Sequence, residues 1–154
     1  MTDETLTIRR AESRDLDAII RLLADDALGQ ARETVAPPLP EAYRAAFAAI
    51  DRDPHQHLVV AERDGVVVGT LQITLIPGLS HRGTWRGQIE AVRIARDLRG
   101  AGLGRRLMDW AVAHCRDQGC RLVQLTSDAT RTDAHRFYES LGFRPTHVGF
   151  KQPM

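Results

Sequence analysis

The sequence predicts an α/β (α+β) fold in which a mixed central sheet carries helices on both faces. Two β-branched runs joined by Asp64-Gly65 indicate a hairpin, because this dipeptide favours a tight turn between antiparallel strands. The second half of the chain alternates strand-like and helix-like patterns, which is typical of a sheet covered by helices. A length of 154 residues suffices for one core, so we expect residues 1–154 to form a single domain.

The first half of the chain is expected to hold one strand, two helices and the hairpin. Leu6 to Arg10 alternates like a short strand, and Ser13 is a suitable N-cap for the helix that follows. A proline-rich stretch separates the two helices, so Gly29 to Pro40 is expected to be a mobile loop beside a substrate. The expected elements run from Leu6 to Arg10, Ser13 to Ala27, Glu41 to Ile50, His57 to Arg63 and Val66 to Ile76.

The second half is expected to add three strands and two helices, which makes six strands in total. The expected strands run from Gln88 to Ala95, Leu122 to Thr126 and Phe143 to Phe150, and the helices carry the apolar stripes Leu103 to Cys115 and Ala134 to Leu141. Simple alternation along the first of these strands gives two faces, one with Ile89 and Ala91, the other with Gln88, Glu90, Val92 and Ile94.

The composition is that of an ordinary soluble globular protein, with 43% hydrophobic and 27% charged residues. The net charge of +1 gives no bulk field that would favour nucleic acid or a membrane surface as partner. No apolar run approaches the roughly 20 residues of a membrane span, and Met1 to Arg10 lacks the apolar core of a signal peptide. We therefore expect a cytoplasmic protein that binds neither nucleic acid nor membrane.

No metal site is expected from the cysteines and histidines. Cys115 and Cys120 form neither a disulfide framework nor a zinc pattern, and both are interpreted as small core or near-core residues. His55 and His57 flank one polar residue, but no third ligand follows at a telling spacing. These two histidines are therefore interpreted as solvated side chains.

Arg99 to Gly104 is the most informative stretch of the chain. It lies between a strand-like and a helix-like pattern, where glycines let the backbone approach an anion and the first helical N–H groups point at it. The dinucleotide fingerprint fails because Arg105 stands at its third glycine position, and no Gly-Lys-Ser/Thr ending supports a Walker A loop. Between His81 and Arg106, seven arginines face two acidic residues, a local charge of +5 that suits a polyphosphate ligand. A glycine-rich turn without a ligand and simple solvated arginines are the alternatives.

Three segments resemble signatures of the GCN5-related N-acetyltransferase (GNAT) family. Arg-x-x-Gly-x-Gly at Arg99 to Gly104 resembles the acetyl-CoA loop, Ala134 to Phe143 resembles the Ala-x-x-x-Tyr-x-x-x-Gly-Phe signature, and Gly87 to Ile94 resembles the strand that often carries a glutamate. The order and spacing of the three segments agree with the family. The resemblance implies a GNAT fold, whose mostly antiparallel sheet has six to seven strands, and acetyl-CoA as co-substrate.

The resemblance also implies which residues bind the co-substrate. The amides from Gly100 to Arg105 would hold the pyrophosphate while Arg99 screens its charge, and the main chain of Val92 to Ile94 would pair with the pantetheine arm. Many relatives carry asparagine where this chain has Arg131, which either replaces a contact with the arm or reaches a CoA phosphate. The expected cofactor-binding residues are therefore Val92, Arg93, Ile94, Arg99, Gly100, Ala101, Gly102, Leu103, Gly104, Arg105 and Arg131.

Glu90 and Tyr138 are the catalytic candidates. An amine must lose a proton before it attacks a thioester, and Glu90 is the candidate base, directly or through a water, at a position expected to be buried beside the cleft. Tyr138 is the candidate acid for the departing thiolate, because family members commonly place a tyrosine near the sulfur. The alternatives are a structural carboxylate paired with Arg93 or Arg86, and a tyrosine that simply packs in the core.

The acceptor is the least determined part of the prediction. Trp85 and Arg86 belong to the loop Pro77 to Gly87, where they are expected to contact an acceptor that carries a carboxylate; a surface loop is the alternative. The leading function is acetyl transfer from acetyl-CoA to a small primary amine in a ternary complex, because no activated nucleophile stands out. Protein N-terminal or lysine acetylation and a non-catalytic acyl-CoA sensor are the alternative functions. Relatives are often dimers, so a homodimer is one further expectation.

Overall fold

The computed structural model describes residues 5–154 and contains a five-stranded sheet in the order β1-β2-β3-β4-β5. Neighbouring strands are antiparallel except β4 and β5, which are parallel. The strands are β1 (Leu6–Arg10), β2 (Gln56–Arg63), β3 (Val66–Ile76), β4 (Arg86–Ile94) and β5 (Leu122–Leu125). The expected β2–β3 hairpin is confirmed, and its turn residues Asp64 and Gly65 have φ values of 51° and 78°.

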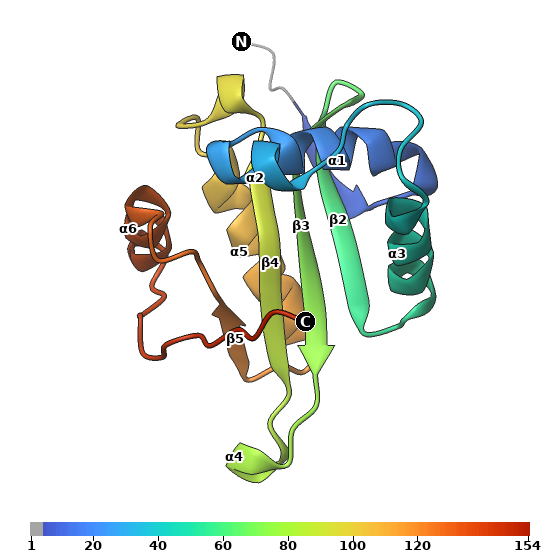
Figure 1. Cartoon of the computed structure of the whole chain (residues 1–154). Helices are drawn as coiled ribbons and strands as arrows, with labels where there is room; N and C mark the ends of the chain where they lie inside the picture. The colour runs from blue at the N-terminus through green and yellow to red at the C-terminus, as the bar shows by residue number, and fades with distance from the viewer. Residues whose placement is uncertain (1–4) are drawn as a thin grey trace.

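Helices cover both faces of this sheet, as the sequence predicts (Figure 1). The helices are α1 (Leu16–Ala24), α2 (Ala27–Arg32), α3 (Glu41–Arg52), α4 (Ser80–Gly83), α5 (Leu103–Asp117) and α6 (Thr132–Ser140), with short 3-10 turns η1 (Ser13–Asp15) and η2 (Arg96–Leu98). In the view of Figure 1, α5 lies behind the sheet, α1 and α2 lie in front of its upper half, and α6 stands beyond β5. Of the helices that the structure describes, none therefore lies over the lower front face of the sheet.

The larger core lies between α5 and the sheet. Ile73 of β3, Ile89 of β4 and Leu107 of α5 are completely buried in it. A smaller cluster around Val60 of β2 lies on the opposite face, under α1. Successive side chains of a strand point to opposite faces, so the neighbours of Ile73 and Ile89 along their strands point away from α5.

The cysteines behave as expected, whereas one histidine does not. Cys115 is buried and Cys120 packs beside it, both as free thiols, which confirms their interpretation as core residues. His57 was expected to be solvated, but it is partly buried, and its Nδ1 lies 3.4 Å from Nε2 of His114. Within residues 5–154, no group of three or more His, Cys, Asp or Glu side chains could hold a metal ion. No helix in this range is long and apolar enough to cross a membrane.

The prediction of a sixth strand from Phe143 to Phe150 is wrong. This segment pairs with no strand in the part of the chain that the structure describes. The Thr146 N–H instead donates to the Arg144 carbonyl at 3.0 Å in a local turn. Val148 and Phe150 are 79% and 93% exposed. The segment has strand-like apolar residues but pairs with no strand edge, so the sheet ends at β5 and has five strands rather than six or seven.

The helix expected from Ser13 to Ala27 is interrupted. A 3-10 turn precedes α1, and Asp26 caps a new helix by accepting the Gly29 N–H at 2.5 Å. The expected loop Gly29 to Pro40 therefore begins inside α2. Glycine is required at the start of this helix, because a Cβ atom on Gly29 would collide with the carbonyl oxygen of Leu23.

Candidate active site

β4 changes its partners halfway along its length. Its first half, Arg86–Ile89, is paired on both sides, with β3 and with β5. Its second half, Glu90–Ile94, is paired with β3 alone, because the register with β5 ends at Ile89 and Leu125. In Figure 1, β5 accompanies only the lower part of β4. The outer edge of β4 is therefore free where the strand approaches the glycine loop, and such an edge suits an extended, amide-rich ligand.

A β-bulge lies in this free half of β4. Glu90 pairs with Gln72, whereas Arg93 pairs with Thr70, so three steps along β4 correspond to two along β3. Ala91 adopts a φ of 55° within the bulge. The extra residue shifts the alternation of side chains for the rest of the strand.

The shifted alternation corrects the faces expected for this strand. Simple alternation puts Glu90 on one face with Val92 and Ile94. In the structure, Val92 and Ile94 pack against the α5 core, while Glu90 is exposed on the opposite face. Arg93 points to that opposite face too, because its Nε lies 3.6 Å from the carboxylate of Asp26 at the start of α2.

The glycine loop ends in an open helix N-terminus. Gly102 is the N-cap of α5 with a φ of 81°, and no side chain in the described part of the chain caps the helix. Gly100 has a φ of 83°, and a Cβ atom at either glycine would meet no atom within 4 Å. The first amides of α5 are therefore available to an anion, which the helix dipole favours. Gly104 differs, because a Cβ atom there would lie 3.2 Å from the Phe137 ring, so its small size allows α5 and α6 to pack closely.

The two arginines of the loop also have structural contacts. Arg99 donates to the carbonyl oxygens of Ile94 and Asp25, at 3.2 and 3.1 Å, which ties the loop to the end of α1. Arg105 donates to the Ser140 carbonyl at 3.3 Å, which ties α5 to α6. Both side chains remain exposed beside the loop, where they add positive charge.

Tyr138 combines core packing with a hydroxyl near positive charge. The centroid of its ring lies 5.4 Å from that of Phe137 and 6.2 Å from that of Phe143. Burial raises the pKa of the Tyr138 hydroxyl, while the charges of Arg131 and Arg93 act in the opposite direction. The hydroxyl is therefore protonated at neutral pH and within electrostatic reach of both guanidinium groups, as a proton donor to a thiolate requires.

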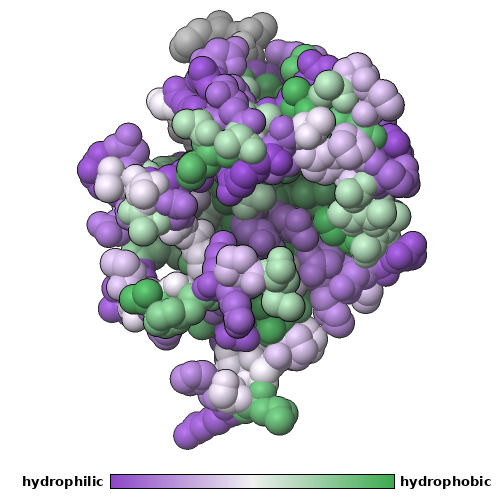
Figure 2. All heavy atoms as spheres, in the orientation of Figure 1, coloured by the Kyte–Doolittle hydropathy of each residue, from purple (hydrophilic) through white to green (hydrophobic). Residues whose placement is uncertain are grey.

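Glu90 lies on an open polar face of the sheet. Its side chain is exposed and makes no ion pair within residues 5–154, so both the expected burial and the alternative pairing with Arg93 or Arg86 are wrong. Hydrogen bonds on the same face join glutamine side chains from four strands, Gln124 to Gln88 at 2.7 Å and Gln72 to Gln56 at 2.8 Å. Figure 2 shows this face hollowed below α1 and α2, with hydrophilic side chains inside the hollow.

A cluster of charged side chains, missed by the sequence analysis, lies near Tyr138. Asp26 is 3.6 Å from Arg93 and 4.0 Å from Arg131, and the charge of Arg32 acts on the same carboxylate. Burial lowers the pKa of Arg93, and the neighbouring guanidinium groups lower it further, against the effect of Asp26. The only sequence signal for this cluster was Arg93, an arginine in an otherwise apolar stretch. Its partners lie far away along the chain, so the sequence alone does not show that they meet. We call Arg32, Arg93 and Arg131 around Asp26 the arginine cluster.

Trp85 and Arg86 lie at the other end of β4 from the glycine loop. At about 3.3 Å per residue, the length of the strand puts roughly 26 Å between Arg86 and Ile94. Trp85 packs against the α5 core, and its ring centroid lies 5.4 Å from that of His55. The structure therefore makes Trp85 a packing residue and brings neither residue to the free half of β4.

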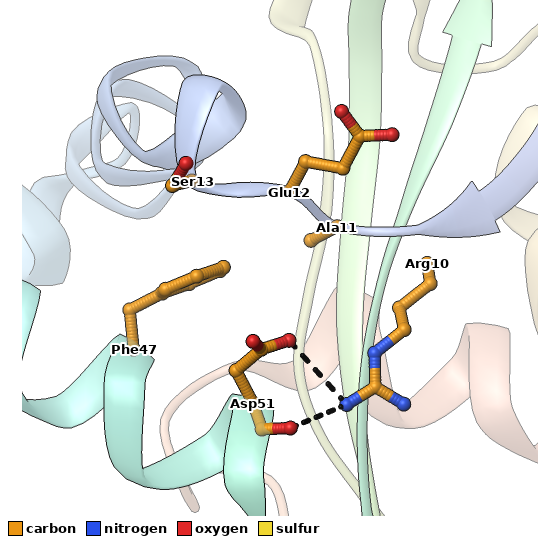
Figure 3. Close-up of a pocket in the computed structure, with 6 residues that line it drawn as sticks. All are labelled: Arg10, Ala11, Glu12, Ser13, Phe47 and Asp51. Carbon is orange, nitrogen blue, oxygen red and sulfur yellow. Dashed lines mark hydrogen bonds and ion pairs between the residues drawn. The ribbon is translucent and has the colours of Figure 1, made fainter.

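A separate pocket lies at the opposite edge of the sheet (Figure 3). It is lined by Arg10, Ala11, Glu12, Ser13, Phe47 and Asp51. Arg10 forms one side of the pocket and donates to the main-chain oxygen of Asp51 at 3.1 Å. β1 and β4 are separated by two strands, and none of the sequence-predicted site residues lines this pocket.

Comparison with known proteins decides the family. The model of the acetyltransferase (GNAT) family matches residues 16–143. This chain belongs to the GNAT family. It is 30% identical over 147 residues to aminoalkylphosphonate N-acetyltransferase of Salmonella typhimurium, with 96% of this chain and 90% of that protein covered. It is 32% identical to glucosamine 6-phosphate N-acetyltransferase of Trypanosoma brucei brucei, with 94% and 93% covered.

The solved structures agree with this assignment of the fold. A crystal structure from Bacillus halodurans C-125, described as a transcriptional regulator, matches with a TM-score of 0.94 at 44% identity and covers 97% of this chain and 100% of that chain. Other solved structures of the same fold contain CoA or acetyl-CoA. The protein is thus an N-acetyltransferase that uses acetyl-CoA. The free edge of β4 and the uncapped start of α5 fit an amide-rich arm that ends in a pyrophosphate.

Proposed function

We propose that this GNAT enzyme transfers acetyl to the primary amine of a small molecule by direct attack within a ternary complex. Two relatives that match the chain along nearly their whole length act, by their names, on small amines. Neither cysteine suits a covalent acetyl-enzyme, because burial raises the pKa of Cys120 and raises that of Cys115 to about 11. Direct transfer to the amine needs no such intermediate.

In this proposal the co-substrate lies along the free half of β4. The main chain of Val92 to Ile94 offers hydrogen bonds to the pantetheine arm, and the amides from Gly100 to Arg105 hold the pyrophosphate. Arg99 adds positive charge beside the loop. A main-chain N–H beside the bulge polarises the thioester carbonyl, as an oxyanion donor should.

Glu90 and Tyr138 then supply the proton transfers. Glu90 accepts a proton from the amine, directly or through a water, and the amine nitrogen forms a bond to the acetyl carbon. The bond between that carbon and sulfur breaks, and the Tyr138 hydroxyl donates its proton to the sulfur. The nitrogen loses its second proton as the amide forms; this proton restores the Tyr138 hydroxyl through solvent, while Glu90 releases the first proton to solvent. Overall, a protonated amine and acetyl-CoA give an amide, the CoA thiol and one proton released to solvent.

The continuity between the free edge of β4 and the uncapped N-terminus of α5 carries this proposal. The test mixes the enzyme with acetyl-CoA and with a panel of small primary amines or lysine-containing peptides, and follows thiol release. We expect release with at least one small amine and none with the peptides. Release with peptides alone would favour protein acetylation, and binding of acetyl-CoA without release would favour a non-catalytic sensor.

A further inference from the structure

We propose that the arginine cluster binds an acidic group of the amine acceptor, such as a phosphonate, phosphate or carboxylate. This inference rests on the proposed function, because it names the class of amine that the same site accepts. Arg93 forms the floor of the cluster, while Arg131 and Arg32 form its rim around Asp26. The side chain of Arg131 is 37% exposed, so a ligand from solvent can reach the rim.

The guanidinium groups have hydrogen-bond donors to spare. Arg93 is only 10% exposed, yet its Nε has no hydrogen-bond partner among residues 5–154, and its Nη1 donates to the Val92 carbonyl at 2.9 Å. The Asp26 carboxylate lies 3.6 Å from Arg93 and 4.0 Å from Arg131, which is close enough to offset charge but too far for a hydrogen bond. A buried donor without an acceptor is unfavourable, so an anionic oxygen placed here would be bound well.

The cluster also keeps a surplus of positive charge. Its three guanidinium groups face two carboxylates, Asp26 and Asp128, which leaves one positive charge. Asp128 already accepts hydrogen bonds from the Thr130 N–H and hydroxyl, at 2.9 and 2.6 Å. Planar guanidinium groups match the oxygen pairs of phosphonates, phosphates and carboxylates, so a ligand of this kind satisfies both the charge and the unused donors.

The position of the cluster suits an acceptor rather than the co-substrate. The glycine loop leads into α5 on one face of the sheet, whereas Arg93 and Glu90 share the opposite, hollowed face (Figure 2). Tyr138 is within electrostatic reach of Arg93 and Arg131, so the cluster adjoins the proposed proton donor. Glu90 and Arg93 are three residues apart, or about 10 Å of strand at most. One short molecule can therefore place its amine at Glu90 and its anionic group at Arg93.

Three probe amines test this specificity by thiol release. 2-Aminoethylphosphonate, β-alanine and n-propylamine share a primary amine on a short chain and differ in the acidic group. We expect kcat/KM for the two anionic amines to be at least about tenfold higher than for n-propylamine, because charge-assisted hydrogen bonds act on them alone. Equal values for the three amines would overturn the inference.

Arg32→Gln tests the cluster itself, since Arg32 is on the exposed rim and is not among the expected cofactor-binding residues. We expect KM for the anionic amines to rise about tenfold, with less than a twofold change for n-propylamine. Arg136→Gln is the matched control, because Arg136 is likewise an exposed helical arginine and is paired with Asp133 on α6. Arg136→Gln should change neither the KM for the anionic amines nor that for n-propylamine. The dissociation constant of acetyl-CoA should stay within twofold in both variants, and a rise confined to Arg32→Gln would show that Arg32 binds the co-substrate instead.

Ethylphosphonate separates this inference from the proposed function, because it has the acidic group but no amine. Calorimetry in the presence of CoA should detect its binding to the wild-type enzyme and weaker binding to Arg131→Gln and Arg32→Gln. If no amine releases thiol while ethylphosphonate binds in this pattern, the proposed function fails and the anion site stands. If thiol is released but ethylphosphonate does not bind, the anion site fails and the proposed function stands.

Discussion

The two halves of β4 belong to one strand but differ in what surrounds them. Arg86–Ile89 is paired on both sides, and Ile89 enters the α5 core. Glu90–Ile94 has one neighbouring strand, a bulge, an exposed carboxylate and a buried guanidinium with an unused donor. The main-chain groups on the outer edge of β4 are paired with β5 in the first half and are left available to a ligand in the second half. Consecutive segments of one strand therefore provide stability and ligand binding, and single substitutions should separate the two.

Ile89→Ala should have the largest effect, and it should act on stability. Ile89 is completely buried, so the substitution leaves a cavity and should lower the free energy of unfolding by about 2–5 kcal/mol. Urea denaturation measures the loss, while the dissociation constant of acetyl-CoA for the folded variant should stay within twofold. Val66→Ala is the control, because Val66 is largely exposed on β3 and should cost less than about 0.5 kcal/mol. A loss below about 1 kcal/mol for Ile89→Ala would contradict the role given to the paired half.

Tyr138→Phe should have the next largest effect, on the rate of the chemical step. The phenyl ring keeps its packing, but the proton donor is lost, so kcat should fall about 100-fold while acetyl-CoA binding is unchanged. Thiol release and calorimetry measure the two quantities. Tyr43→Phe is a matched control, because the Tyr43 hydroxyl donates to Glu33 at 2.7 Å and its helix α3 packs on β2, two strands from β4. An unchanged kcat in Tyr138→Phe would reduce Tyr138 to a packing residue.

Gly102→Val should weaken acetyl-CoA binding by about tenfold or more. Valine blocks the approach of a phosphate to the amides and is strained at a φ of 81°. Gly119→Val separates these causes, because Gly119 has a φ of 89°, equally open surroundings and a place at the other end of α5. Both variants should lose about 1–2 kcal/mol of stability from strain. A dissociation constant that rises equally in both would place the pyrophosphate elsewhere.

Local signals made the β2–β3 hairpin and the glycine loop predictable. Asp64-Gly65 marks the hairpin because both residues must take positive φ, and the loop glycines mark the approach to α5 for the same reason. The bulge carries no such mark. Ala91 takes a φ of 55° although alanine does not favour this conformation. Alternation alone therefore put Glu90 on the same face as Val92 and Ile94, whereas the structure has them on opposite faces.

Contacts between distant parts of the chain were not predictable in the same way. Asp26 meets Arg93 only because the first helix breaks and restarts, and that break depends on a close approach at Gly29. Phe143 to Phe150 has strand-like residues, but whether it forms a strand depends on an available partner. The sequence therefore predicted the backbone of the candidate site better than its side-chain charges.

The smallest expected effect is a pH dependence of stability from a histidine pair on the α5 side. His57 of β2 and His114 of α5 meet at 3.4 Å, and the ring centroid of Trp110 lies 4.9 Å from that of His114. Burial lowers the pKa of both histidines, and the charge of His114 lowers that of His57 further. As the pH falls through the ordinary value of about 6.5, the unfolded chain takes up protons that the folded protein does not. The free energy of unfolding should therefore fall until the pH passes the lower pKa values of the folded state.

Urea denaturation at pH 7.5, 6.5 and 5.5 measures this dependence. His114→Gln should make the loss of stability towards pH 5.5 shallower, because one of the two partly buried histidines no longer titrates. His147→Gln, at an exposed position, should leave it unchanged. Equal pH dependence in wild type and His114→Gln would mean that the pair does not resist protonation in the folded state. The pair packs on the face of the sheet opposite Glu90, so kcat of the folded enzyme should not follow the pH dependence of stability.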